Sequence, residues 1–275
     1  MKKVAPLRYD VIFKKAFSVP EIFTAFVRDL LGIDIEIDVV EKDKAYSPSI
    51  GSVATKFDLY AEDKKNRVIV YIQHVRSADH YHRFLHYHCI ALLEQVVNSD
   101  DYHPKVFMLV VLTSGDRHKK DISITDFDPK DLQGKPFGEI DHKIVYICPK
   151  YLDKKVTPKQ CHEWLEAIND SMDEQVDESH YTLPEIKRIF NLIEKDKVTP
   201  EERARMFDEH SEEEIKQEGF KEGLKEAKKM VKQAEEKAKQ QVKESAARHL
   251  KALNVLSDEQ IASATGLSLE SVKAL

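Results

Sequence analysis

The pattern of apolar and polar residues predicts helices at the start of the chain. Residues 7–31 keep helical periodicity in two pieces; Pro20 begins the second piece and Gly32 is a good helix stop. Residues 33–40 then alternate apolar and acidic positions, which is typical of a strand. The chain is therefore expected to open with two helices and one strand.

The next part of the sequence predicts a hairpin and further strands. Two β-rich runs, 56–63 and 67–74, flank a polar turn and indicate a β-hairpin. Residues 79–97 suit an amphipathic helix, 105–113 a buried strand and 143–147 a shorter strand. This order of elements indicates an α/β core built on a mixed sheet.

From about residue 158 the pattern becomes wholly helical, and 211–250 is dominated by Lys, Glu, Gln and Ala. Apolar or small residues recur there with the four-three spacing of a coiled-coil seam, and the spacing shifts near the end. The seam positions are Phe220, Leu224, Ala227, Val231, Ala234 and Ala238, then Val242, Ala246 and Leu250. The alternative is a single solvated helix held by ion pairs four residues apart. We expect a homodimer or higher homo-oligomer through residues 211–275.

The last residues predict two short helices, with Ser257 and Ser268 as N-caps and Gly266 at the turn. This resembles a helix-turn-helix. The second helix offers one basic residue, Lys273, whereas base reading needs several donors. A packing or dimerisation cap is therefore favoured over DNA readout. The predicted divisions are a core at 1–157, a helical extension at 158–210, the charged helix at 211–250 and the terminal hairpin at 251–275.

Composition narrows the class of protein. Charged residues make up 33% of the chain and the net charge is −6, which fits a soluble globular protein. The chain has 3 cysteines, an odd number, and they are widely spaced. We therefore expect no disulfide framework, and the cysteine content is consistent with a protein of a reducing compartment. No apolar leader and no run near the ~18 apolar residues of a membrane span is present. We expect a cytoplasmic protein without membrane association.

The hairpin carries the candidate chemistry. Asp58 lies on its first strand, and Gln73 and His74 end its second. A hard cation such as Mg²⁺ takes one or two carboxylates with waters and substrate phosphate, and it polarises a scissile phosphate. Asp10 is a second candidate ligand if the first helix packs beside the hairpin. The alternative role for Asp58 is an exposed strand residue that deters edge pairing.

Several short motifs together resemble a known family. They are Asp10-Val11-Ile12-Phe13-Lys14, Lys56-Phe57-Asp58, Tyr71-Ile72-Gln73, Arg83-Phe84-Leu85-His86-Tyr87, Ile261-Ala262 and Thr265-Gly266-Leu267-Ser268. Their order and spacing resemble the PD-(D/E)XK nuclease family transposases, also called recombination-promoting nucleases. The resemblance covers the core to about residue 150 and the charged C-terminal arm. It implies a restriction-endonuclease-like fold that cuts DNA with Mg²⁺ or Mn²⁺.

The resemblance also assigns roles to single residues. In that family the first strand supplies an Asp and the second a Glu-x-Gln. Asp58 matches the Asp and Gln73 the Gln, but Tyr71 falls where the Glu belongs. A tyrosine, with a pKa of about 10, is neutral at pH 7 and a poor Mg²⁺ ligand. Metal affinity and cleavage are expected to fall unless another carboxylate takes the place of the missing one.

Other residues are candidates for that rescue and for binding DNA. Glu94, on the helix after the hairpin, is a possible metal ligand; its alternative role is a surface residue. Arg83 and Tyr87 match the family's Arg…Tyr positions, and Arg83 is expected to bind backbone phosphate unless it pairs with Asp79 or Glu94. Lys14 is a further expected phosphate contact.

Five histidines lie between positions 74 and 88. His82 and His86 are four residues apart, as zinc ligands on a helix can be. His74, next to Gln73, is a candidate for phosphate contact or proton transfer. The alternative is that these histidines are packing or surface residues.

Two readings of the function follow from these residues. The first is a Mg²⁺-dependent endonuclease that hydrolyses phosphodiester bonds of DNA, in which Asp58 holds the metal with help from Asp10 or Glu94. The second is a catalytically degenerate nuclease-like protein that acts as a DNA-binding or oligomeric interaction module. Tyr71 separates them.

Overall fold

A computed structural model describes residues 1–46, 55–74, 80–94 and 105–275. The chain divides into two compact units, Met1–His210 and Ser211–Leu275. The strands are β1 (Lys2–Lys3), β2 (Glu41–Tyr46), β3 (Thr55–Glu62), β4 (Asn66–Gln73), β5 (Lys105–Leu112), β6 (Ile122–Asp126), β7 (Lys143–Ile147) and β8 (Gln175–Val176). The helices are α1 (Asp10–Phe17), α2 (Pro20–Leu31), α3 (His80–Leu93), α4 (Lys159–Asp170), α5 (Pro184–Leu192), α6 (Pro200–Leu253), α7 (Asp258–Thr265) and α8 (Leu269–Lys273). Short 3₁₀ turns cover Pro149–Tyr151, Ser171–Asp173, Glu178–His180 and Lys195–Lys197.

Six strands of the first unit form one mixed sheet in the order β2-β3-β4-β5-β7-β6. β4, β5 and β7 run parallel to their neighbours in that set, and the remaining pairs are antiparallel. The predicted hairpin is the β3–β4 pair. A mixed α/β sheet with flanking helices is therefore confirmed.

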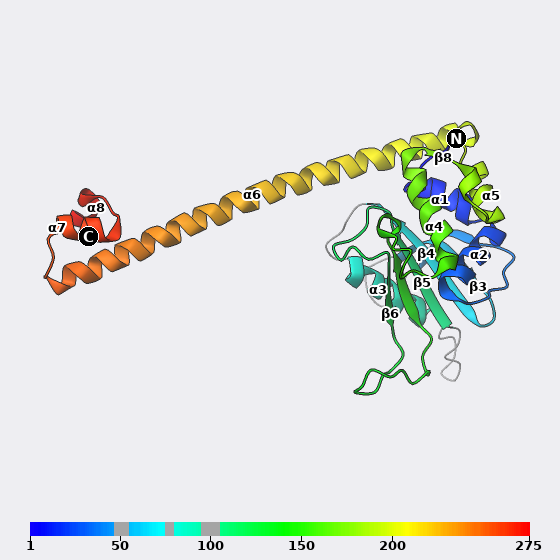
Figure 1. Cartoon of the computed structure of the whole chain (residues 1–275), viewed down its shortest axis with the longest axis horizontal. Helices are drawn as coiled ribbons and strands as arrows, with labels where there is room; N and C mark the ends of the chain where they lie inside the picture. The colour runs from blue at the N-terminus through cyan, green and yellow to red at the C-terminus, as the bar shows by residue number, and fades with distance from the viewer. Residues whose placement is uncertain (47–54, 75–79, 95–104) are drawn as a thin grey trace. The chain divides into compact units, whose positions relative to one another are not determined.

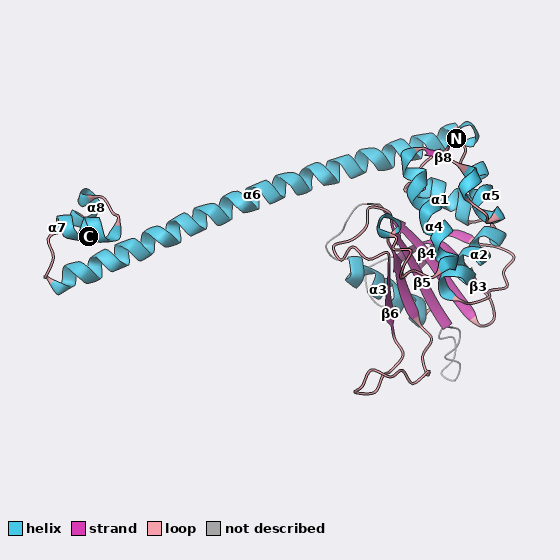
Figure 2. Ribbon diagram, viewed as in Figure 1, coloured by secondary structure: helices cyan, strands magenta, loops and turns pink. Residues whose placement is uncertain are grey.

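Helices cover both faces of this sheet (Figures 1 and 2). α1, α2, α4 and α5 pack on one face, and α3 packs on the other. Trp164 of α4 lies against Phe26 of α2, with ring centroids 5.2 Å apart. The segment 158–210, expected as a separate extension, therefore closes the same apolar core and belongs to the same compact unit.

Several strands differ from the sequence-based expectation. β1 and β8 form a two-residue antiparallel pair, and β8 lies in the part after residue 158 that was expected to be wholly helical. Residues 33–40 do not form a strand; Ile35 and Val40 are buried as anchors, and the strand follows at Glu41–Tyr46. That strand, β2, lies at the edge of the sheet and has a polar sequence. It therefore lacks the apolar alternation by which a strand is recognised in a sequence. The second edge strand, β6, is half-exposed and was not predicted for the same reason.

The helices also differ in their bounds. α3 begins at His80, while Asp79 and residues 95–97 of the predicted helix lie outside the described residues. α6 begins at Pro200 and has 54 residues, so the charged helix is longer than 211–250. No helix in the described ranges is both long and apolar enough to cross a membrane.

The terminal hairpin of the second unit packs on the end of α6. A small core joins Ala247 to Ile261, Leu267 and Val272. Ser257 forms a capping box with Gln260 at the start of α7, and α7 ends at Gly266, whose φ of 65° is in the left-handed region that suits glycine. α7 and α8 therefore bury their apolar sides against α6.

Candidate functional site

Asp58 lies where the hairpin strands separate. The last backbone pair of β3 and β4 at this end is Leu59 with Val70. Beyond it, Oδ2 of Asp58 accepts a hydrogen bond from the backbone N–H of Ile72 at 3.0 Å. The carboxylate thus takes the place of a strand partner, and the hydrogen bond fixes one of its oxygens.

A second aspartate faces Asp58 from the neighbouring strand. β2 and β3 pair at Lys42 with Leu59 and at Lys44 with Phe57, and Asp43 and Asp58 lie between these pairs. Asp43 has a φ of 57°, a conformation that Asp tolerates better than most residues. This local turn of the strand brings the Asp43 carboxylate to the same lysine that Asp58 meets.

That lysine is Lys14, on α1. Its Nζ lies 2.6 Å from Oδ2 of Asp10, 2.5 Å from Oδ1 of Asp43 and 3.6 Å from Oδ1 of Asp58. The Lys14 side chain is only 8% exposed, whereas Asp10 is 43% exposed, so the cluster is buried at its centre and open at its rim. Lys14, expected to bind phosphate, instead has its ammonium surrounded by three carboxylates.

The first turn of α1 is tied to a distant part of the chain. The backbone N–H of Asp10 donates to Oε2 of Glu209, on α6, at 3.0 Å. A carboxylate at a helix N-terminus satisfies free N–H groups there. Glu209 therefore helps to place Asp10, and with it the i,i+4 pair with Lys14.

The charges of the cluster shift its pKa values. Burial, assisted by the charge of Asp10, raises the pKa of Asp58 to about 7, although Lys14 and the Ile72 N–H act in the other direction. Burial opposes the charge of Lys14, but Asp58 and the hydrogen bonds to Asp10 and Asp43 hold its pKa above the usual value. Burial therefore favours the neutral form of the Asp58 carboxyl, while its neighbours keep Lys14 charged.

A second group of site residues lies on the α3 side of the sheet. The Tyr71 ring is 5.1 Å from Phe84 and 5.6 Å from Tyr87, between centroids. Nη2 of Arg83 donates to Oε1 of Gln73. Arg83 thus orients the Gln73 amide, and Tyr87 packs on Tyr71.

Tyr71 belongs to the second group, and its pKa is influenced by burial and also by the charge of Asp58. Its side chain is buried, and its hydroxyl has no hydrogen-bond partner among the described residues. Burial raises its pKa far above the usual value, and the negative charge of Asp58 adds to the effect. The residue at the expected Glu position is therefore a buried, neutral hydroxyl on the α3 side of the sheet.

His74 follows β4, and its Nδ1 lies 2.9 Å from Oγ1 of Thr113. Burial, together with the positive charges of Arg8, His210 and Lys150, lowers its pKa to about 4. With a pKa of about 4 the imidazole is neutral and a weak base at pH 7, which fits a hydrogen-bonding role better than the expected phosphate contact or proton transfer.

The structure does not bring Glu94 to this site. Arg67, at the start of β4, donates from Nη1 to the carbonyl oxygen of Ala91 at 2.9 Å. The end of α3 therefore lies beside the start of β4, about 20 Å along the strand from Gln73 at 3.3 Å per residue. Glu94 follows that end of α3 and is exposed, so the expected rescue by its carboxylate is not realised.

The other histidines do not form a metal site. His82 and His86 are exposed on α3, while His88 is buried and stacks on Phe127 at 4.9 Å between centroids. Within the described ranges, no group of three or more His, Cys, Asp and Glu side chains is arranged to hold a metal ion. His82 and His86 therefore lie at the surface of α3, and His88 packs in the interior.

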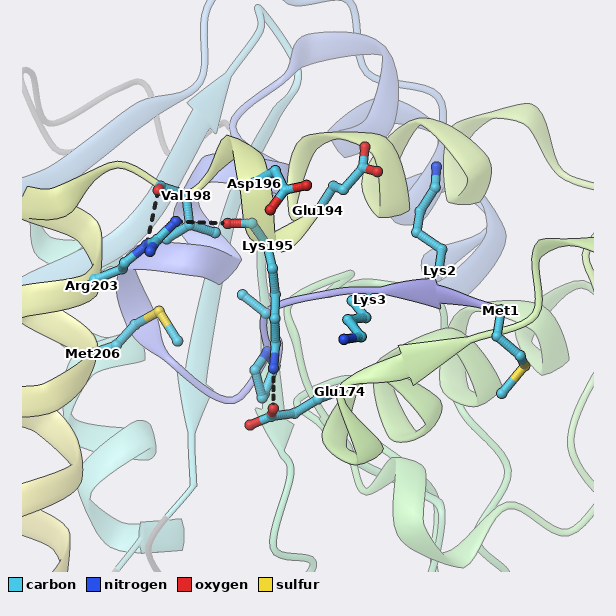
Figure 3. A pocket seen from close by; sticks show the side chains of 12 residues that line it. Met1, Lys2, Lys3, Glu174, Glu194, Lys195, Asp196, Val198, Arg203 and Met206 are labelled. Carbon is cyan, nitrogen blue, oxygen red and sulfur yellow. Dashed lines mark hydrogen bonds and ion pairs between the residues drawn. The ribbon is translucent and has the colours of Figure 1, made fainter.

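A hollow away from this cluster lies beside β1 (Figure 3). Lys195 pairs with Glu174 there, and Arg203 donates to the carbonyl oxygens of Val198 and Lys195 at 3.2 and 3.1 Å. None of the predicted site residues lines it. With these charges already paired, it is a weaker candidate than the carboxylate cluster.

Sequence reasoning missed two residues of the site, Asp43 and Glu209. Asp43 lies in the polar edge strand β2, and Glu209 is one of many acidic residues of α6. Neither has a local pattern that separates it from its neighbours. Comparisons of the chain with family models, with curated proteins and with solved structures gave no match.

Proposed function

We propose that this protein is a divalent-metal-dependent endonuclease that hydrolyses DNA, with a restriction-endonuclease-like core of the recombination-promoting kind that its sequence resembles. The observation that carries the proposal is the convergence of Asp10, Asp43 and Asp58 around one buried ammonium. A carboxyl group whose pKa is strongly shifted, such as that of Asp58, is typical of functional sites.

The donor set suits a hard divalent cation. Three carboxylates surround the Lys14 ammonium, so a positive charge is stabilised at this position. The raised pKa of Asp58 indicates that more positive charge would be stabilising there. Mg²⁺ commonly binds through only one or two carboxylates, with waters and substrate phosphate as the other ligands. Asp58 and Asp10 are the residues that would hold it.

Each residue of the site has a role in this proposal. The bound cation supplies polarisation of the phosphate and a more acidic water. Lys14 offsets the mutual repulsion of the carboxylates. Gln73, whose amide oxygen accepts from Arg83, would orient a water or the phosphate. Arg83 adds positive charge for the DNA backbone.

The test is nicking of supercoiled plasmid by the full chain with Mg²⁺ or Mn²⁺. Asp58→Asn keeps the size of the side chain and its acceptor for Ile72, but it removes the charge. We expect at least about a hundredfold loss of nicking, because loss of a group that only supports a metal ligand already costs 10–100-fold. Asp173→Asn, the same change at an exposed aspartate, is the matched control. Equal nicking by both variants would exclude Asp58 from the chemistry.

Tyr71 favours a second candidate function. Tyr71 places a buried, neutral hydroxyl where the resemblance expects a carboxylate. A metal at this site would therefore have one negatively charged ligand fewer. The protein would then be a catalytically degenerate module that binds DNA without cutting it.

Tyr71→Glu distinguishes the two functions. If the wild-type chain neither binds Mn²⁺ nor nicks DNA and Tyr71→Glu does both, the degenerate reading holds and the enzyme proposal fails. Tyr71→Gln is the neutral control of matched size, and circular dichroism of each variant checks that the buried substitution has not unfolded the protein.

A further inference from the structure

The middle of α6 presents apolar side chains to solvent. Leu224 is 48% exposed, Val231 57% and Val242 69%, and helical geometry places them along one stripe. Gly219 and Gly223 lie just before it, and each weakens a helix by about 1 kcal/mol relative to alanine. A solvated helix with two glycines and an apolar stripe gains stability when a partner covers the stripe.

The charges along α6 change sign beside this stripe. Residues 211–224 contain five acidic and two basic residues, whereas 225–246 contain seven basic and four acidic ones. Two copies aligned in parallel would place like charge beside like charge. Two antiparallel copies centred near residue 229 would place residues 211–224 beside 234–247, which contain three lysines and three glutamates, so the two acidic segments no longer face each other.

The sizes of the seam residues select the same orientation. In a parallel pair each seam residue faces the same residue of the second helix. Ala227 would then face Ala227, and two small side chains would fill that layer of the interface poorly. In an antiparallel pair centred near residue 229, Leu224 shares a layer with Ala234 of the second copy, and Ala227 with Val231. Large residues then face small ones, which fills the seam evenly.

We propose that α6 is the self-association surface of this protein and that its occupant is a second copy of the same helix, packed antiparallel about residue 229. The proposal is independent of the nuclease proposal, because it rests on residues 211–246 alone.

The first test is the oligomeric state of the full chain by sedimentation equilibrium. We expect a dimer whose dissociation constant does not rise with added salt, since the lysine-rich residues 225–232 of the two copies lie beside each other and salt screens their repulsion. Val231→Glu should give a monomer. Met230→Glu is the matched control, because Met230 is 69% exposed but lies off the stripe. A monomer at all concentrations, or equal loss of the dimer in both variants, would overturn the proposal.

The second test is the orientation. A spin label at Gln240→Cys, with the exposed Cys89 changed to Ser, reports the distance between the two copies. At 1.5 Å per residue, antiparallel packing about residue 229 separates the two labelled backbones by about 33 Å. A short distance, about that of two helices in contact (~10 Å), would mean parallel packing and would overturn the proposed orientation.

Discussion

At the scale of single residues, Asp58 should make stability depend on pH. Its pKa is about 7 in the folded chain, against a usual value of 3.8. The stability that the neutral carboxyl provides is fully present below pH 3.8 and is lost as pH rises towards 7. Asp58→Asn, always neutral, should therefore be more stable than wild type by roughly 1–3 kcal/mol at pH 8, with the gain vanishing below pH 4.

Urea unfolding across this pH range measures the difference. Asp173→Asn should follow the wild-type curve. If Asp58→Asn is instead less stable than wild type at pH 8, the attraction between Asp58 and Lys14 stabilises the fold by more than the burial of the Asp58 charge destabilises it.

Lys14 gives a second prediction at this scale. Lys14→Met keeps the apolar stem but leaves three carboxylates without their shared ammonium. We expect a loss of roughly 2 kcal/mol, less than the 3–5 kcal/mol for a fully buried pair because two of the carboxylates are about 40% exposed. Millimolar Mg²⁺ or Mn²⁺ should restore part of this stability by binding the freed carboxylates.

Thermal unfolding with and without the metal measures this rescue. Lys42→Met, at an exposed lysine of β2, is the control and should show no larger metal effect than wild type. If metal stabilises Lys14→Met and wild type equally, the metal does not bind at the position of the ammonium.

A third residue-scale prediction concerns Tyr71. Its hydroxyl is buried with no partner among the described residues, and such a group costs about 1–3 kcal/mol relative to one that is satisfied. Tyr71→Phe should therefore leave the free energy of unfolding unchanged or raise it, by up to about 1 kcal/mol. A clear loss in chemical denaturation would show that the hydroxyl makes a stabilising hydrogen bond.

At the scale of elements, the caps of the terminal hairpin are testable. Ser257 accepts from the backbone N–H of Gln260, and Gln260 accepts in return from that of Ser257. Ser257→Ala should cost about 1 kcal/mol of local stability. Ser263→Ala, in the exposed interior of α7, should cost nothing or stabilise slightly. Hydrogen exchange of the α7 amides in the full chain distinguishes the two variants.

Elements were predictable where one face is buried. The β3–β4 hairpin, α3 and β5 all have a strong apolar pattern, because the sheet or its covering layer excludes water from them. The edge strands β2 and β6 lack this pattern. For them, hydrogen bonding to a neighbouring strand decides the structure, and a sequence window does not contain that neighbour.

At the scale of the whole molecule, the first unit should need its late helices. α4 and α5 bury Trp164, Ile189 and Phe190 against α1 and α2, so a fragment 1–157 would expose that apolar face. We expect the fragment 1–210 to unfold in one cooperative transition and 1–157 to lack one, as followed by circular dichroism in urea. A cooperative transition of the fragment 1–157 would mean that the sheet and α1–α3 are a domain by themselves.

The sequence by itself determined the order of the buried elements and the hairpin that carries Asp58, because burial leaves a periodic pattern. Only the tertiary structure decided which charged residues meet. Lys14, expected to face DNA, lies among Asp10, Asp43 and Asp58, while Glu94 lies at the far end of β4. The physical reason is that contacts between distant segments depend on how helices pack on a sheet, and the spacing of residues along the chain does not encode that packing.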